Sequence, residues 1–161
     1  MSEKQKITLT VNGVKYIKYV PPRKLLVDLL RDDLELLGTH AGCEHGVCGS
    51  CTILYNGKTA RSCLMFAVQA NGAEIMTVEG LATNGNLHPI QQSFHDLHGL
   101  QCGYCTPGML MTAYEFLKEN PSPTEEETRE AMAGVLCRCT GYKQVIDSVM
   151  DAAGKIQNTG G

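Results

Sequence analysis

Cysteines are the residues of this 161-residue chain whose type and spacing could do chemistry. The eight of them fall into two sets of four, spaced C-x4-C-x2-C-x11-C and C-x2-C-x31-C-x1-C, and none is left over. The first cysteine set is Cys43, Cys48, Cys51 and Cys63, and the second cysteine set is Cys102, Cys105, Cys137 and Cys139. Four thiolates are what one [2Fe-2S] cluster needs, and C-x4-C-x2-C is the plant-type ferredoxin spacing. The pattern predicts two one-electron centres, which together can hold both electrons of a two-electron oxidation.

Disulfides and structural zinc are the alternative uses of these cysteines. Disulfides need an oxidising compartment, and the N-terminal residues 1–6 lack the apolar core of a signal peptide. Structural zinc sites of this type usually pair two short C-x2-C-like knuckles, which the first cysteine set does not offer. The C-x2-C step of the second cysteine set, taken alone, suits zinc nearly as well as iron, so its spacing leaves that choice open.

Composition and missing motifs exclude several classes of function. The net charge is −3 without a block of like charge, whereas a nucleic-acid binder carries a basic stripe. No apolar run approaches the roughly 20 residues that span a bilayer. No dinucleotide-binding or Walker loop is present, so nothing indicates that the chain binds FAD by itself, and neither a Ser/His/Asp set nor an HExxH motif occurs. We expect a soluble intracellular chain whose catalysis belongs to partners.

The first half of the chain, up to about residue 80, carries strand signals. Strands are predicted at residues 7–11, 14–20, 52–55 and 74–78, and a leucine-rich helix at residues 25–37 that ends at Gly38. Asn12-Gly13 and Asn56-Gly57 are the preferred dipeptides of two-residue hairpin turns. The first cysteine set then lies in a glycine-rich loop between helix and strand, with Cys63 just beyond the second hairpin.

The second half carries helix signals. Helices are predicted at residues 88–98, 106–120, 124–134 and 142–156, the first with Ile90, Phe94 and Leu97 on one face. Thr106-Pro107 reads as an N-cap followed by proline at the first helical position, and Thr124-x-x-Glu127 as a capping box. The second cysteine set falls at helix ends, where free N–H groups favour anionic sulfur. Four helices with short connections predict a small bundle in which two helix junctions meet around one cluster.

The cysteine motifs resemble those of a known family. The runs GCEHGVCGSCT (42–52), LQCGYCTPGM (100–109) and LCRCTGY (136–142) resemble, in order and spacing, the two cluster motifs of the molybdenum hydroxylases, the xanthine oxidase family. The resemblance covers roughly residues 5–155, and residues 63–72 look most like the small subunit of aerobic carbon monoxide dehydrogenase. It implies an α+β fold, with a β-grasp plant-type ferredoxin domain over residues 1–80 and a four-helix-bundle [2Fe-2S] domain over residues 81–161.

The resemblance also implies a role. Such chains are the small iron–sulfur subunits of oxidoreductase complexes and catalyse nothing alone. A large partner would carry molybdopterin, as a dinucleotide, and a medium partner FAD, in a dimer of heterotrimers. We expect such a complex in the cytoplasm, or associated with a membrane through the complex. The second cysteine set would hold the cluster near the pterin, with Gln101 and Cys139 contacting the pterin, and the first cysteine set the cluster facing the flavin.

A free-standing two-cluster electron carrier is the alternative function. Such a shuttle would usually present a strongly acidic docking face, and a net charge of −3 is mild. A zinc-stapled interaction module is a third, weaker reading. The sequence does not name the substrate of the complex (carbon monoxide, an N-heterocycle, an aldehyde or an aryl-CoA) or its electron acceptor.

Overall fold

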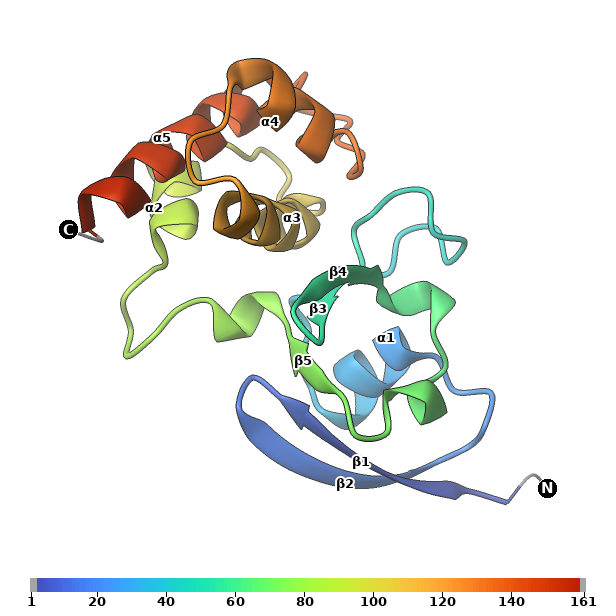
Figure 1. Cartoon of the computed structure of the whole chain (residues 1–161). Coiled ribbons are helices and arrows are strands. Elements are labelled where there is room, and N and C mark those ends of the chain that lie inside the picture. The colour runs from blue at the N-terminus through green and yellow to red at the C-terminus, as the bar shows by residue number, and fades with distance from the viewer. Residues whose placement is uncertain (1–2, 160–161) are drawn as a thin grey trace.

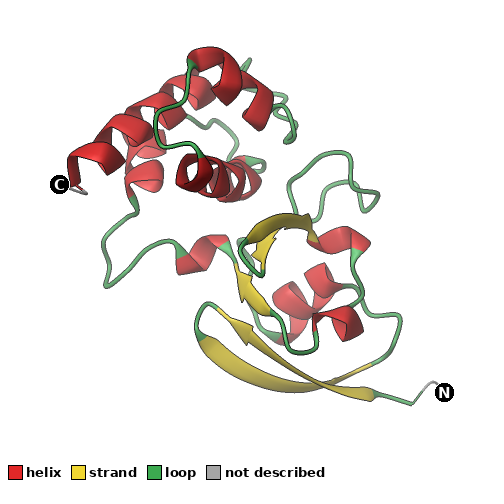
Figure 2. Ribbon diagram, viewed as in Figure 1, coloured by secondary structure: helices red, strands yellow, loops and turns green. Residues whose placement is uncertain are grey.

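The computed structural model describes residues 3–159 and has a mixed α+β architecture (Figure 1). Strands occur in the N-terminal half, and the C-terminal half is built from helices (Figure 2). The two ends of the chain lie at opposite ends of the molecule (Figure 1). The predicted α+β class is therefore confirmed.

A five-stranded sheet forms within the described residues, in the order β2-β1-β5-β3-β4. The strands are β1 (Gln5–Val11), β2 (Val14–Val20), β3 (Thr52–Tyr55), β4 (Lys58–Arg61) and β5 (Glu74–Met76). β1 pairs antiparallel with β2 and parallel with β5, and β3 runs antiparallel to β4 and β5. Both predicted hairpin turns are present, since Asn12 and Asn56 have φ of 50° and a glycine follows each. The predicted strand 74–78 ends at Met76, because a 3-10 turn begins at Val78.

The predicted helix over residues 25–37 is wrong in length and type. A short α1 (Leu26–Asp28) continues as a π-helical turn, η1 (Leu29–Asp33). The Leu34 N–H donates to the Leu29 carbonyl five residues back, at 3.1 Å, and Glu35 has a left-handed φ of 57°, which ends the helix. The leucine pattern misled because Leu34 and Leu36 also pack against the core under the sheet, but from the segment after the helix.

The four predicted helices of the second half are all present. They are α2 (Pro89–Asp96), α3 (Thr106–Glu119), α4 (Glu125–Met132) and α5 (Lys143–Thr159). The Thr124/Glu127 capping box is confirmed, but Cys105 rather than Thr106 is the N-cap of α3. Leu97 was predicted to face inward and is instead 40% exposed, because α2 ends at Asp96.

Two hydrophobic cores hold these elements together. One lies between the sheet and the α1–η1 turn and includes Ile7, Leu9, Leu26, Leu30, Ile53 and Ile75. The other lies among α2, α3, α4 and α5, includes Ile90, Phe94, Met109, Met132, Val145 and Val149, and also takes in Leu54 from β3. Because α3 packs on β3, the two halves share a packed contact. The division at residue 80 stays a prediction.

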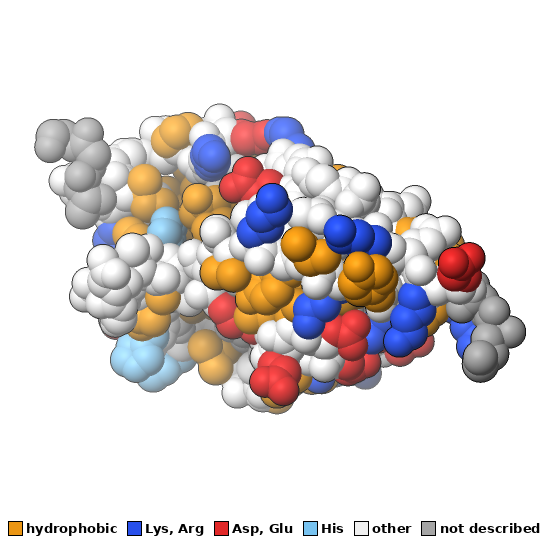
Figure 3. Space-filling view, turned by 90° about the horizontal axis from the view of Figure 1, so that it is seen from below, with side chains coloured by type: hydrophobic (Ala, Val, Ile, Leu, Met, Phe, Trp, Pro, Cys, Tyr) orange, Lys and Arg blue, Asp and Glu red, His pale blue; other side chains and the backbone are white. Residues whose placement is uncertain are grey.

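The surface on the side of β1 and β2 is of mixed polarity. Figure 3 views the molecule from the side on which β1 and β2 lie in Figure 1, and shows apolar side chains interspersed with basic and acidic ones. On β2, Ile17 and Tyr19 are 56% and 62% exposed. None of the helices within residues 3–159 combines the length and the apolar character that a bilayer span requires.

Candidate metal centres

The second cysteine set is gathered around one cavity of about 140 Å³. Cys102 and Cys105 reach it from the turn that starts α3, and Cys137 and Cys139 from the loop between α4 and α5. The sulfurs of Cys102 and Cys139 are 3.6 Å apart, and the side chains of Cys105 and Cys137 are in hydrogen-bonding contact. The fold thus brings together thiols from two distant parts of the sequence.

The first cysteine set lies in the loop between η1 and β3 and in the 3-10 turn that follows β4. The Cys48 N–H donates to the sulfur of Cys43 at 3.4 Å, and Cys63 contacts Cys51 and lies within electrostatic range of Cys43. Cys51 and Cys63 are buried, whereas Cys43 and Cys48 are half-buried. This set therefore has one enclosed side and one side open to solvent.

Thiols meet in pairs in both sets. The pairs are Cys43 with Cys48, Cys51 with Cys63, Cys102 with Cys139, and Cys105 with Cys137. Across residues 3–159, no three His, Cys, Asp or Glu side chains are placed to hold a single metal ion. Paired thiols fit the two irons of a [2Fe-2S] cluster, each with two thiolates, whereas structural zinc takes four ligands around one ion. The donor sets therefore suit clusters.

The thiols differ in how readily they ionise without metal. Backbone N–H groups, above all that of Cys48, lower the pKa of Cys43 to about 6. Burial raises the pKa of Cys63 to about 11 and that of Cys105 to about 12. Burial also disfavours the Cys137 thiolate, but hydrogen bonds from Thr140 outweigh it and its pKa is lowered. The buried thiols would release protons on binding iron, so cluster binding is coupled to deprotonation.

The other predicted site residue, Gln101, is exposed beside the cavity of the second cysteine set. Two cysteines of this set, Cys102 and Cys139, are also exposed. Leu136 and Tyr104 line the cavity with them and are 52% and 46% exposed, and Leu100, which precedes Gln101 in the chain, is 39% exposed. The cavity thus opens to the surface beside exposed apolar side chains, and of the two predicted contact residues Cys139 lines it, whereas Gln101 does not.

The loops of the two cysteine sets are in direct contact. The Leu136 N–H, next to Cys137, donates to the Cys48 carbonyl at 2.8 Å. Arg61 of β4 donates to the Gly134 carbonyl at 2.6 Å and fixes the segment that leads to this bond. A Cβ at Gly49 would come within 2.5 Å of the Gly134 carbonyl oxygen, and its φ is +74°, so only glycine fits this contact.

Tyr104 joins the same two loops from the other side. Its hydroxyl donates to the Ala41 carbonyl at 2.7 Å, and its own carbonyl lies 2.7 Å from Nδ1 of His40. The two rings stack with centroids 4.7 Å apart. Tyr104 stands between Cys102 and Cys105, so it ties the loop of the second set to the segment before Cys43.

We expect Tyr104→Phe to weaken this link while keeping the ring stack. Loss of one hydrogen bond should lower the free energy of unfolding by about 1 kcal/mol, measured by denaturant titration. Tyr114→Phe is the matched control, because the Tyr114 hydroxyl makes no hydrogen bond within residues 3–159. Equal losses in both variants would show that the Ala41 bond contributes nothing of its own.

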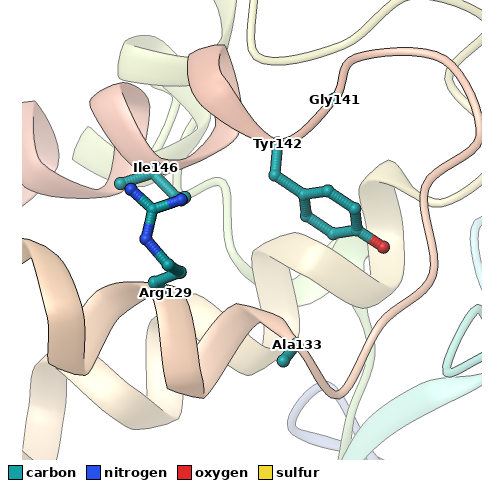
Figure 4. A pocket seen from close by; sticks show the side chains of 5 residues that line it. All are labelled: Arg129, Ala133, Gly141, Tyr142 and Ile146. Atoms are coloured by element: carbon teal, nitrogen blue, oxygen red, sulfur yellow. The ribbon is translucent and has the colours of Figure 1, made fainter.

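Tyr142 braces the loop that carries Cys137 and Cys139. Its hydroxyl accepts from the Cys137 N–H at 2.8 Å and donates to the Val135 carbonyl at 3.2 Å. Figure 4 shows its ring at one side of a pocket of about 330 Å³ between α4 and α5, with Arg129 at the other side. Arg129 is ion-paired with Glu125. The loop that carries Cys137 and Cys139 is thus held by two hydrogen bonds between the Tyr142 hydroxyl and backbone groups, and neither bond needs a metal.

Sequence reasoning missed three residues that build these sites. Arg61, Tyr104 and the buried Ser50, which lines the cavity of the second cysteine set, all act through contacts distant in sequence. The only local signal was that Ser50 and Tyr104 stand next to predicted ligands. No periodicity or motif marks Arg61.

Comparison with known proteins agrees with this geometry. Residues 11–93 match the family model described as "2Fe-2S iron-sulfur cluster binding domain", and residues 77–150 match "[2Fe-2S] binding domain". Caffeine dehydrogenase subunit gamma of Pseudomonas sp. (strain CBB1) is 55% identical over 89% of this chain and 87% of that protein. The nicotine 6-hydroxylase small subunit of Paenarthrobacter nicotinovorans is 51% identical over 99% and 96%.

The same agreement holds for a solved structure. A chain of quinoline 2-oxidoreductase from Pseudomonas putida 86 superposes with a TM-score of 0.94 at 51% identity, covering 99% of both chains. Both matching family models describe domains that bind [2Fe-2S] clusters, and the relatives are similar to this chain over most of their length. Together these matches identify the family. This chain belongs to the small iron–sulfur subunits of the molybdenum hydroxylases, the xanthine oxidase family.

Proposed function

We propose that this chain is the electron-transfer subunit of a molybdenum hydroxylase, relaying electrons from a molybdenum–pterin site in a large subunit through two [2Fe-2S] clusters to FAD in a medium subunit. The observation that carries this function is the convergence of all eight cysteines into two sets of paired thiols. Each set supplies the four thiolates of one cluster. Such a cluster accepts and releases one electron at a time.

The second cysteine set is proposed as the entry point for electrons. Cys102 and Cys139 are its exposed members, and the apolar rim near them, Leu100, Leu136 and Tyr104, suits burial against a partner. A large subunit docked on this rim would bring the pterin against Cys139. Gln101, exposed beside it, offers an amide that can both donate to and accept from the pterin.

The first cysteine set is proposed as the exit toward FAD. The loop around it presents Val47, Leu64 and Phe66, which are 60%, 59% and 46% exposed. Two separate apolar rims, one at each cysteine set, support a subunit between two partners more than a free-standing carrier, which would need one polar docking face.

Electron transfer between the two clusters has a short bonded route in this fold. It runs from Cys137 through the peptide to the Leu136 N–H, across the 2.8 Å bond to the Cys48 carbonyl, and so to a ligand of the first set. Gly49, Arg61 and Tyr104 hold the two loops at this contact. This rigidity would keep the distance between the clusters fixed.

The finer architecture is part of the same proposal. A β-grasp sheet with its helical turn over residues 1–80 would be the flavin-side domain, and a bundle of α2, α3, α4 and α5 over residues 81–161 the pterin-side domain. We propose a dimer of heterotrimers in the cytoplasm, with molybdopterin as a dinucleotide.

The substrate class is proposed from the names of the relatives. Those reported above are named for caffeine, nicotine and quinoline, and on that basis we propose a nitrogen heterocycle as substrate. Bleaching of the cluster absorbance by an aldehyde instead would contradict this choice.

Gln101→Leu tests the proposed pterin contact. The change keeps the size of the side chain and removes its hydrogen bonds, while the cysteines remain intact. We expect slower reduction of the iron–sulfur centres by substrate in a rapid-mixing experiment, with unchanged iron content. Molybdenum and subunit ratios must match those of the native complex, since their loss would mean weaker docking instead. Unchanged reduction kinetics in a fully molybdenum-loaded complex would show that Gln101 is only a loop residue.

A further inference from the structure

Thr140 lies against a cysteine sulfur of the second set. Its hydroxyl oxygen is 3.1 Å from the sulfur of Cys137, and its backbone N–H donates to the same sulfur at 3.5 Å. Thr140 follows Cys139 in the loop between α4 and α5 and is half-buried. One residue thus places two polar groups against a single ligand of the proposed cluster.

The direction of the bond between the Thr140 hydroxyl and the Cys137 sulfur follows from their chemistry. A hydroxyl can both donate and accept, and the Thr140 oxygen accepts the N–H of Tyr142 at 3.1 Å. A cysteine that binds iron is a thiolate and carries no proton, so with a cluster bound Cys137 can only accept. The hydroxyl is therefore the donor.

The backbone of this loop holds the hydroxyl in place. Gly141 and Tyr142 have left-handed φ values of 62° and 68°, and a non-glycine residue keeps such a conformation only where its surroundings hold it. The Tyr142 hydroxyl accepts from the Cys137 N–H at 2.8 Å and donates to the Val135 carbonyl at 3.2 Å. Hydrogen bonds among Cys137, Thr140 and Tyr142 thus fix the position of the donor relative to the sulfur.

A donor to a ligand sulfur changes the redox properties of a cluster. Hydrogen bonds to the sulfurs are among the factors that set the reduction potential of an iron–sulfur centre. Reduction adds negative charge to the cluster and its ligands, so a donor stabilises the reduced form more than the oxidised form. A hydrogen bond of this type therefore raises the potential.

We propose that the Thr140 hydroxyl donates a hydrogen bond to the Cys137 thiolate of the bound cluster, and so raises the reduction potential of the cluster held by the second cysteine set. The inference rests on the proposed function, because it needs a cluster on these four cysteines. It makes Thr140 a tuning residue, which binds no iron itself and acts through its neighbour Cys137.

Thr140→Val in the complete complex tests the proposal, because it removes the hydroxyl and keeps the branched side chain and the backbone N–H. The two reduction potentials would be measured by a redox titration followed by electron paramagnetic resonance, with the second-set signal identified as the one that Cys105→Ser abolishes. We expect the potential of the second-set cluster to fall in Thr140→Val and to stay near the native value in Thr140→Ser, which keeps a hydroxyl. A native-like potential in Thr140→Val, or an equal fall in both variants, would overturn the role of the hydroxyl.

Tyr142→Phe is the matched control for damage to the loop. It removes both hydrogen bonds of the Tyr142 hydroxyl but keeps the Tyr142 N–H and the Thr140 hydroxyl. We expect this variant to unfold more easily but to keep the second-set potential closer to the native value than Thr140→Val does. A fall as large as that in Thr140→Val would show that the potential follows the rigidity of the loop and not the Thr140 hydroxyl.

Exchange into heavy water gives a measurement that does not depend on how well a variant folds. Pulsed electron paramagnetic resonance of the reduced native complex should detect an exchangeable hydroxyl deuteron coupled to the second-set cluster, which Thr140→Ser should keep and Thr140→Val should lose. Absence of this coupling from the native complex would overturn the role of Thr140 while leaving the cluster assignment intact. Full iron content in Cys105→Ser would instead overturn the proposed function itself.

Discussion

Cys105→Ser is expected to remove one cluster and to loosen the helical half of the chain. Cys105 is the N-cap of α3 and contacts Cys137 in the loop between α4 and α5, so its cluster would tie two helix junctions together. In such sites metal binding contributes directly to folding. Iron should fall from about four to about two atoms per chain, and the melting temperature of the helices should drop, as measured by iron analysis and circular dichroism.

The result that would contradict this expectation is specific. A Cys105→Ser chain that assembles with its partners and keeps full iron would show that the second cysteine set does not bind a cluster. Cys48→Ser serves as the reciprocal control, because it removes the same number of thiols from the other set.

Cys48→Ser is expected to interrupt the relay at its far end. The first-set cluster should be lost or strongly perturbed, whereas the helical half and its cluster should remain, because Cys48 lies in the loop before β3. Substrate should still reduce the second-set cluster in a rapid-mixing experiment, but turnover with the physiological acceptor should nearly stop. Iron should again fall to about two atoms per chain.

Turnover at the native rate in a Cys48→Ser complex that has lost its first-set cluster would contradict the order of the relay. The electrons would then reach the acceptor without passing through the first set. Loss of substrate reduction in the same variant would place the first set, rather than the second, next to the molybdenum site.

The two hairpin turns and the start of α4 were predictable, because each is determined by residues that are neighbours in the sequence. The Asn-Gly dipeptides fix two hairpins through their left-handed backbone, and Thr124 with Glu127 starts α4 through a capping box. The division of the cysteines into two sets follows from spacing alone. The expected plant-type loop is present, with Gly46 and Gly49 at positive φ.

The remaining features depend on contacts that spacing does not encode. The helix expected over residues 25–37 stops at Asp33 because Leu34 and Leu36 reach the core from an irregular segment. Which thiol pairs with which depends on how the loop between α4 and α5 meets the start of α3. Ser50, Arg61 and Tyr104 gain their roles only when the two cysteine loops come together.

Two distinct clusters in one chain are the central claim, and electron paramagnetic resonance of the reduced complex, combined with iron analysis, tests it most directly. One set lies at a half-open loop and the other at a cavity between helix ends, so hydrogen bonding and solvent exposure differ, and with them the cluster properties. We predict two separable [2Fe-2S] signals and about four iron atoms per chain. A single signal, or about two iron atoms per chain, would contradict the account.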